Sequence, residues 1–220
     1  WGVSTRLVGA VIMAHGDDKG LRLPPKIAPY QVVMVPISRD ESGCLKVRKF
    51  ISPVLDEMRA KGVRIYEDWS DNSPGFKFNE WEMKGVPLRL EVGPRDIESG
   101  QAVLVRRDTG EKIVLEKNMI TAQAPMLLEE IQKGLFEQAL EFREKNTHEV
   151  SSYSNFRDTI KNKGGFIRCG WDGAQKTEMK IKEDTNATIR CILNKEDSSG
   201  MKCVYSGNPA KHVVIYGKAY

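Results

Sequence analysis

The sequence predicts an α/β fold with a mixed sheet, followed by a small α+β domain. Residues 31–37 form a nearly continuous apolar run, which is typical of a strand buried on both faces in a parallel sheet. Residues 101–107 and 112–117 flank the turn Asp108-Thr109-Gly110 and predict an antiparallel hairpin at one side of that sheet. Strand and helix patterns alternate over 28–123, as they do in α/β folds.

The first 27 residues precede this region of alternating patterns. They contain a Gly-rich start, an apolar stretch over 7–14 and a polar turn over 15–20. The adjacent prolines Pro24 and Pro25 favour an extended chain. A domain boundary or linker is therefore expected near residue 28.

The region 28–123 contains the elements of the predicted mixed sheet. Beyond the run over 31–37, the patterns predict helices over 45–62 and 76–84 and strands over 63–66 and 86–92. Along 86–92 apolar and polar side chains alternate, so Arg89 lies on the face opposite Leu88 and Leu90. Packing in the apolar core therefore does not account for Arg89.

The rest of the chain predicts a long helix and a second domain. One apolar stripe predicts a helix over 124–146, and its members are Leu128, Ile131, Leu135, Ala139 and Phe142. The small α+β domain is expected over 151–220, with strands near 165–169, 187–193, 201–205 and 212–217.

Composition restricts the class of protein. A length of 220 residues allows one or two domains. The 34 Lys and Arg against 30 Asp and Glu give a net charge of +4, which permits a polyanionic partner without requiring one. Four cysteines are too few for a disulfide framework and fit a reducing cytosol. No apolar run approaches the roughly 20 residues that span a bilayer, so no membrane partner is expected.

Two short motifs suggest ligand contacts. Arg6 follows Gly2-Val3-Ser4-Thr5, and an arginine on a strand after such a small-residue turn can approach a triphosphate and pair with it through its planar fork. A motif this short also fits an ordinary surface arginine. The sequence His15-Gly16-Asp17-Asp18 offers too few converging ligands for a metal site, so its expected role is structural.

The other motif that suggests ligand contacts is Phe78-Asn79-Glu80-Trp81-Glu82 followed by Val86-Pro87-Leu88-Arg89. Guanine presents O6 and N7 acceptors that suit an arginine fork, and N–H donors that suit a carboxylate. Glu82 and Arg89 can therefore read guanine edges, or they can form a surface ion pair worth under about 1 kcal/mol.

Each of four other side chains near this motif allows two interpretations. Trp81 and Phe76 can stack on bases or pack in the core, and the core is the commoner place for such aromatics. Arg106 and Arg107 can touch phosphates or remain solvated.

Long blocks of the sequence resemble prolyl-tRNA synthetases. The blocks are WGVSTRLVGAVIMAHGDDKGLRLPPKIAPYQVVMVPI, DWSDNSPGFKFNEWEMKGVPLRLEVGPRD, VLVRRDTGEK and GNPAKHVVIYGKAY, and they extend over essentially the whole chain. The resemblance is to the archaeal/eukaryotic-like subtype, because residues beyond the anticodon domain are present and the bacterial subtype typically ends without them. It implies four regions: the end of the class II catalytic domain (1–27), an anticodon-binding domain (28–123), a connecting helix (124–150) and a C-terminal domain (151–220).

The resemblance implies proline–tRNA ligase activity for the parent protein, which joins proline to its tRNA with ATP. Arg6 and Ser4 then line the site of Mg-bound ATP, and Glu82 and Arg89 read the two anticodon guanines of proline tRNA. Motif 1 and motif 2 of the family are absent from this sequence, as is an initiator Met. We therefore expect part of a longer, homodimeric, cytoplasmic enzyme, and no aminoacylation from these residues alone.

Two expectations concern the C-terminal domain. Relatives often bind zinc through C-x₄-C and C-x₂-C, but Ala174 and Ser206 replace two of the four ligands, so Cys169 and Cys203 alone are expected to hold no zinc. Cys191 is expected in the core. In relatives the terminal carboxylate reaches towards the active site, and Tyr220 matches that position; packing of Tyr220 on its own sheet is the alternative.

A free-standing RNA-binding module with the anticodon-domain fold and without ligase activity is the other reading of the sequence. The block around Arg6 and the proline-rich exit argue against it, because such a module has no use for a catalytic motif.

Overall fold

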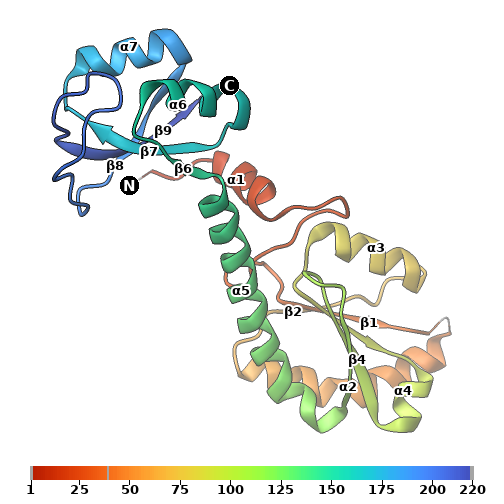
Figure 1. Ribbon diagram of the computed structural model, residues 1–220. Helices are drawn as coiled ribbons and strands as arrows, with labels where there is room; N and C mark the ends of the chain where they lie inside the picture. The colour runs from red at the N-terminus through yellow and green to blue at the C-terminus, as the bar shows by residue number, and fades with distance from the viewer. Residues whose placement is uncertain (1, 39, 219–220) are drawn as a thin grey trace. The chain divides into compact units, whose positions relative to one another are not determined.

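The computed structural model describes residues 2–38 and 40–218, so the expected docking of Tyr220 lies outside the described residues. The chain divides into two compact units, Trp1–Ala139 and Leu140–Tyr220 (Figure 1). The elements of the first unit, which ends within the last helix, are α1 Arg6–His15, β1 Val32–Pro36, α2 Glu41–Ala60, β2 Ile65–Glu67, α3 Pro74–Lys84, β3 Leu88–Val92, α4 Pro94–Ser99, β4 Gln101–Arg106, β5 Lys112–Glu116, η1 Lys117–Met119 and α5 Ile120–Lys145.

The first unit is built on a mixed sheet with strand order β2-β1-β3-β4-β5. Strand β1 runs parallel to β2 and β3, whereas β3, β4 and β5 pair antiparallel. All five residues of β1 are buried, as expected for a strand covered on both faces. The predicted α/β class and the hairpin at one side of the sheet are both confirmed.

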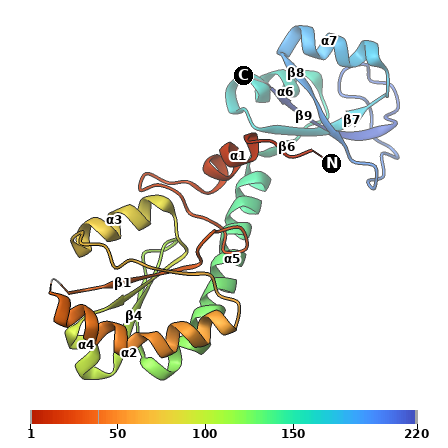
Figure 2. The ribbon, with the colours of Figure 1, turned by 180° about the vertical axis from the view of Figure 1, so that it is seen from behind.

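Helices cover the two faces of this sheet unequally. Leu88, Leu90 and Val92 of β3 face the larger core, which they share with α2 and α5. On the other face, Val33 and Val35 of β1 form a small cluster with Trp81 of α3. Figure 1 and Figure 2 show α2 and α4 on one side of the sheet and α3 on the other.

The ends of α3 explain why this helix is short. The hydroxyl of Ser73 accepts a hydrogen bond from the N–H of Phe76, and Pro74 occupies the first turn. At the other end, Gly85 has φ +74°, the left-handed conformation that terminates helices. Strand β3 begins only three residues later, so Glu82 and Arg89 lie close in sequence on two different elements.

The segment that carries Arg6 differs from the prediction. Arg6 was expected on a strand, but it is the first residue of α1, a helix of ten residues of which none is buried. Strands need partners for their backbone N–H and C=O groups, whereas a helix satisfies these groups within itself. None of the strand pairings among the described residues involves 6–15.

The second unit holds a four-stranded sheet of order β6-β7-β9-β8 and two short helices. Strand β9 pairs antiparallel with β7 and β8, and Phe156, Ile167 and Tyr216 are central to the core. Its elements are β6 Thr147–Glu149, α6 Tyr153–Asp158, the π-helical turn η2 Thr159–Lys163, β7 Phe166–Trp171, α7 Gln175–Thr185, β8 Ala187–Ile192 and β9 His212–Lys218.

Two details of the second unit correct the prediction. Residues 201–205 are not a strand: the N–H of Cys203 bonds to the carbonyl of Asn208, and the N–H of Gly207 bonds to the carbonyl of Cys203, which closes a turn. Cys191 is exposed rather than in the core, because β8 is an edge strand whose register shifts between Ile189 and Cys191. Among the helices of the described residues, none combines the length and apolar character needed to cross a membrane.

Candidate nucleic-acid interface on the α3 face of the sheet

Arg89 lies on the central strand of the first sheet, on the face covered by α3. Its register neighbours are Val33 on β1 and Val105 on β4. The strand alternation predicted this orientation, since Leu88 and Leu90 face the opposite core. A cation among valines is costly to bury unless it is paired, so its partners decide what it can do.

Two neighbours hold the guanidinium of Arg89. Its Nε donates a hydrogen bond of 2.8 Å to Oε1 of Glu91, two residues along the same strand. Its central carbon lies 4.3 Å from the centroid of the Phe78 ring on α3. The ring therefore covers one face of the guanidinium in a cation–π contact, while the carboxylate fixes one edge.

Glu82 has a partner of its own. Its Oε1 lies 3.2 Å from Nζ of Lys19, which belongs to the loop after α1 and is 67% exposed. The ion pair between Glu82 and Arg89, one of the two alternatives from the sequence, does not form. Arg89 pairs with Glu91 instead, and Glu82 pairs with Lys19. Glu82 thus remains half-buried beside a cation that solvent or a ligand can displace.

The loop after α1 is tied to the end of α3. The N–H of Leu21 bonds to the carbonyl of Met83, and the N–H of Leu23 bonds to the carbonyl of Gly85. Arg107 donates to both carboxylate oxygens of Asp17, at 2.6 and 2.9 Å. These contacts give the His15–Asp18 segment the structural role that the sequence predicted.

Arg106 and Arg107 are neither exposed to solvent nor free to bind phosphates. Arg106 donates to the carboxylates of Asp108 and Glu130, and Arg107 pairs with Asp17 and bonds to the carbonyl of Glu82. Arg107 therefore holds the backbone of Glu82 in place, and Arg106 is held by the two carboxylates.

Trp81 is a core residue and Phe76 is not. The indole N–H of Trp81 donates to Oδ2 of Asp68 at 2.7 Å, and the ring is buried against Val33 and Val35. Phe76 is exposed on the outer side of α3. The core interpretation therefore holds for the tryptophan alone.

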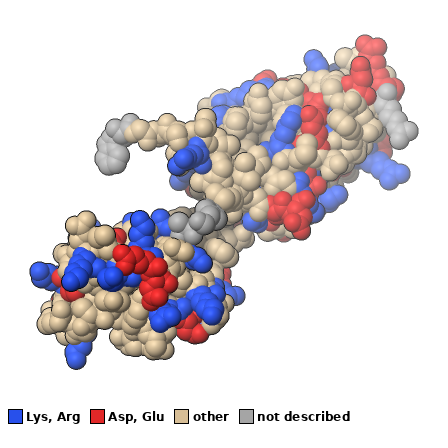
Figure 3. All heavy atoms as spheres, turned by 90° about the horizontal axis from the view of Figure 1, so that it is seen from above, with Lys and Arg blue, Asp and Glu red and all other residues tan. Residues whose placement is uncertain are grey.

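A cavity of about 190 Å³ opens between these elements. Glu82, Arg89, Lys19 and Lys112 are among its lining residues, with Val33 and Val105 at its apolar floor. One carboxylate among several cations suits a ligand with both hydrogen-bond donors and acceptors on an aromatic edge. On the face of the molecule seen in Figure 3, basic and acidic side chains are interspersed.

Protonation of Asp17 provides a test of the loop attachment. The hydrogen bond from Arg107 lowers the pKa of Asp17 from 3.8 to about 2. A lowered pKa stabilises the fold above the ordinary carboxyl pKa, and this contribution is lost as the pH falls from about 4 towards 2. In an Arg107→Gln variant the pKa of Asp17 should return towards 3.8. Carboxyl ¹³C NMR titration measures it, and Asp18→Asn serves as the control; an unchanged pKa in Arg107→Gln would contradict the pairing.

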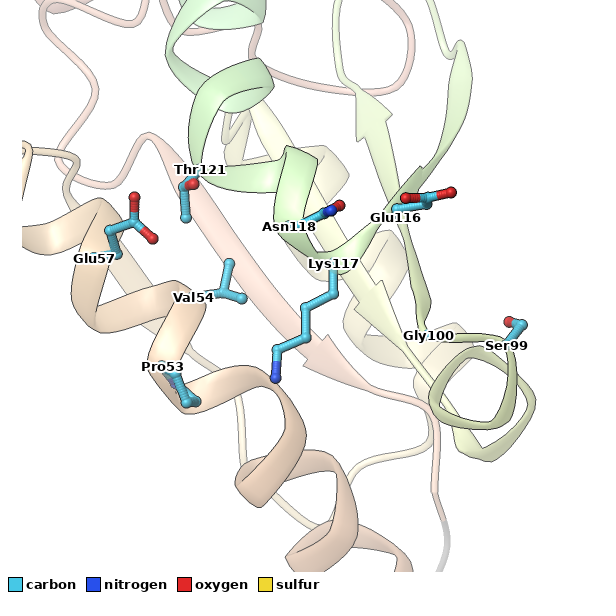
Figure 4. Close-up of a pocket in the computed structure, with 9 residues that line it drawn as sticks. All are labelled: Pro53, Val54, Glu57, Ser99, Gly100, Glu116, Lys117, Asn118 and Thr121. Carbon is cyan, nitrogen blue, oxygen red and sulfur yellow. The ribbon is translucent and has the colours of Figure 1, made fainter.

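The other predicted site residues lie elsewhere. Ser4 and Arg6 are exposed at the start of α1, where the N–H of Arg6 bonds to the Ser4 hydroxyl at 3.4 Å. A larger cavity of about 610 Å³ lies between α2, the turn from α4 to β4 and the start of α5 (Figure 4). It contains none of the predicted site residues, and its Lys117 extends towards α2 over the Phe50 ring.

Ala174 and Ser206 stand near Cys169 and Cys203 in place of the other two cysteines of the family's zinc pattern. Both thiols are buried, and burial raises the pKa of Cys169 to about 12. Asp172 instead joins the two replaced positions, accepting from the N–H of Ala174 at 3.0 Å and from the Ser206 hydroxyl at 2.7 Å. Among the described residues, no three His, Cys, Asp or Glu side chains gather as metal ligands.

No role at the site was predicted for Glu91, Phe78 or Lys19. A signal for Glu91 was present, since it follows Arg89 by two positions and shares its face of the strand. Phe78 precedes Glu82 by one helical turn, which also places them on one face. The contact of Lys19 depends on a loop and has no periodicity to reveal it.

Comparisons with known proteins match the chain over its length. Residues 31–124 match the family "Anticodon binding domain", and residues 153–220 match the family "Prolyl-tRNA synthetase, C-terminal". The chain is 48% identical over 220 residues to a proline–tRNA ligase of Lachnospira eligens and 50% identical over 230 residues to one of Prosthecochloris aestuarii. Each match covers 100% of this chain, and 45% and 47% of those relatives.

A solved structure agrees with these matches. The crystal structure of prolyl-tRNA synthetase from Cryptosporidium parvum, complexed with L-proline and AMP, is 35% identical and has a TM-score of 0.90. It matches 100% of this chain, which in turn covers 46% of the solved one. The chain therefore spans slightly less than half the length of the relatives that it matches.

The matches also bear on subtype and family. The two bacterial relatives align over the whole chain, so the C-terminal domain does not restrict it to the archaeal/eukaryotic-like subtype. With one family over 31–124 and the other over 153–220, the chain belongs to the C-terminal region of the prolyl-tRNA synthetases.

Proposed function

We propose that these residues supply anticodon recognition to a proline–tRNA ligase, with Arg89 and Glu82 reading the two consecutive guanines of proline tRNA. The observation that carries the proposal is the placement of Arg89. It is a cation on a central strand, held by Glu91 and Phe78 and open to a cavity that Glu82 also lines. Apolar packing gives no reason for a charge at this position.

The chemistry of guanine matches these two side chains. The terminal N–H groups of an arginine can donate together to O6 and N7. A carboxylate accepts from the N1–H and N2–H donors of the other edge. Anticodon bases are unpaired and can be splayed into a cavity and read on these edges. Lys19 leaves Glu82 when a base takes its place, at little cost because the pair is partly exposed.

The remaining assignments form part of the same proposal. Residues 1–27 end the catalytic domain, 28–123 bind the anticodon, 124–150 connect, and 151–220 form the C-terminal domain. Ser4 and Arg6 contact Mg-bound ATP in a homodimeric, cytoplasmic enzyme that also binds proline. Motifs 1 and 2 lie outside these 220 residues. The 220 residues therefore do not catalyse ligation alone.

The ligase assignment is preferred over a free-standing binding module. The similarity to proline–tRNA ligases extends over all 220 residues, including the segment of Ser4 and Arg6 that a binding module would not need.

Substitution of Arg89 tests the proposal. Arg89→Ala should weaken binding of proline tRNA by about 1–3 kcal/mol and relax discrimination at one guanine. Lys49→Ala, on α2 across the sheet, is the matched control for loss of one positive charge. Titrations of the chain at fixed salt measure both. Equal affinity of wild type and Arg89→Ala would remove Arg89 from the interface.

Zinc content is a second expected result. Because Asp172 joins Ala174 and Ser206 where ligands are missing, we expect the purified chain to carry no stoichiometric zinc. Elemental analysis decides this. About one zinc per chain would contradict the expectation and require a ligand set beyond Cys169 and Cys203.

A further inference from the structure

We propose that Glu91 and Phe78 are positioning residues that orient Arg89, so that its two terminal nitrogens present a fixed fork to the O6 and N7 edge of one guanine. This inference rests on the proposed function. It adds that the selectivity for guanine comes from the fixed orientation of the guanidinium as well as from its charge.

Glu91 occupies a buried position, where a carboxylate requires a specific partner. It is only 5% exposed, and its register neighbours on the α3 face are Val35 on β1 and Val103 on β4. A carboxylate that leaves water must be paired or hydrogen-bonded. Its partner is Nε of Arg89, and this contact occupies the inner edge of the guanidinium.

The bond to Nε leaves the outer edge of Arg89 available. A guanidinium has five N–H donors in one plane, and a single bond at Nε fixes the direction of the others. The end-on pair of N–H groups, one on each terminal nitrogen, is not used by the bond to Glu91. They can donate two parallel hydrogen bonds, the arrangement that favours guanine over adenine because adenine has an amino group in place of O6.

Phe78 restricts the remaining rotation of the Arg89 guanidinium plane. Its ring centroid lies 4.3 Å from the central carbon of the guanidinium, which limits tilting about the Nε bond. Phe78 and Glu82 are one turn apart on α3, so the helix that braces Arg89 also carries the carboxylate proposed for the other base. Both reading groups are thus positioned by one rigid element.

The test uses the 220-residue chain and a proline anticodon stem-loop containing either guanine or 7-deazaguanine at the position that Arg89 reads. The 7-deaza base lacks only the N7 acceptor. For wild type we expect roughly tenfold weaker binding of the 7-deaza RNA, the effect of one hydrogen bond to a charged group. For Glu91→Ala and Phe78→Leu, with Arg89 present but not oriented, this ratio should fall to about twofold or less.

Conservative and distant variants act as controls. Glu91→Gln keeps an acceptor for Nε and should restore much of the ratio. Glu98→Gln on α4 and Phe136→Leu on α5 change the same residue types at exposed positions and should leave it tenfold. In an Arg89→Ala background, Glu91→Ala should have no further effect on the ratio, because its role acts through Arg89.

The outcomes separate this inference from the proposed function. If Glu91→Ala does not fold, Phe78→Leu decides, since its side chain is half-buried and leucine keeps apolar volume. A tenfold ratio retained in the folded variants would overturn the positioning role while leaving Arg89 as the reader. A ratio near one in wild type, equal to that of Arg89→Ala, would overturn base reading by Arg89 itself.

Discussion

Asp68→Ala should lower the free energy of unfolding of the first unit by about 3–5 kcal/mol, the range for an uncompensated buried charge. Asp68 is 5% exposed and Lys77 is 3% exposed. Nζ of Lys77 lies 3.8 Å from the Asp68 carboxylate and 3.0 Å from its carbonyl, and Trp81 donates to the same carboxylate. Alanine would leave a buried ammonium and a buried indole N–H without this partner.

The consequence should extend to RNA binding, because Trp81 and Lys77 attach α3 to the sheet. Chemical denaturation at neutral pH measures the stability. Asp68→Asn keeps one acceptor for the indole and should lie between wild type and Asp68→Ala. Asp71→Ala, three residues later in an exposed loop, is the matched control and should change stability by less than about 0.5 kcal/mol. A loss below about 1 kcal/mol for Asp68→Ala would contradict the role of this network.

Gly85→Ala is the second variant with a large expected effect. Gly85 ends α3 at φ +74°, and an added Cβ would lie 2.5 Å from the backbone of Leu21. The left-handed conformation costs an alanine about 1–2 kcal/mol, and overpacking adds typically 1–3 kcal/mol. We therefore expect a loss of about 2–5 kcal/mol. The loop would shift away from α3, and Lys19 would separate from Glu82.

Gly62→Ala distinguishes the two contributions. Gly62 also has a positive φ, +83°, but a Cβ there would meet nothing within 4 Å. Only the conformational cost should remain, about 1–2 kcal/mol. Thermal unfolding of both variants provides the comparison. If Gly85→Ala costs no more than Gly62→Ala, the contact between the loop and α3 does not hold the loop in place.

Periodic patterns were enough to predict most of the first unit. The run over 31–37 became β1 and the alternation over 86–92 became β3, because burial on one face or both imposes those patterns directly. The direction of Arg89 followed from the same alternation. The helix expected over 45–62 begins earlier, at Glu41, because Asp40 caps it through the N–H of Gly43.

Features that depend on tertiary neighbours were not predictable. In α7 only Thr177 and Ile181 are buried, so the helix has almost no apolar stripe to identify it. The exposure of Cys191 depends on a register shift in an edge strand. Among the site residues, the pairing of Glu82 with Lys19 depends on a loop held in place by Arg107 and by Met83.

The proposed function requires that the α3 face of the sheet reads two guanines in the anticodon of proline tRNA. Its most direct test is the affinity of the wild-type chain for proline anticodon stem-loops in which each guanine is replaced in turn by adenine, at one fixed salt concentration. We expect each replacement to weaken binding by roughly 5–150-fold, equivalent to about 1–3 kcal/mol for each base that is read. Equal affinity for all of these RNAs would contradict anticodon recognition by Glu82 and Arg89.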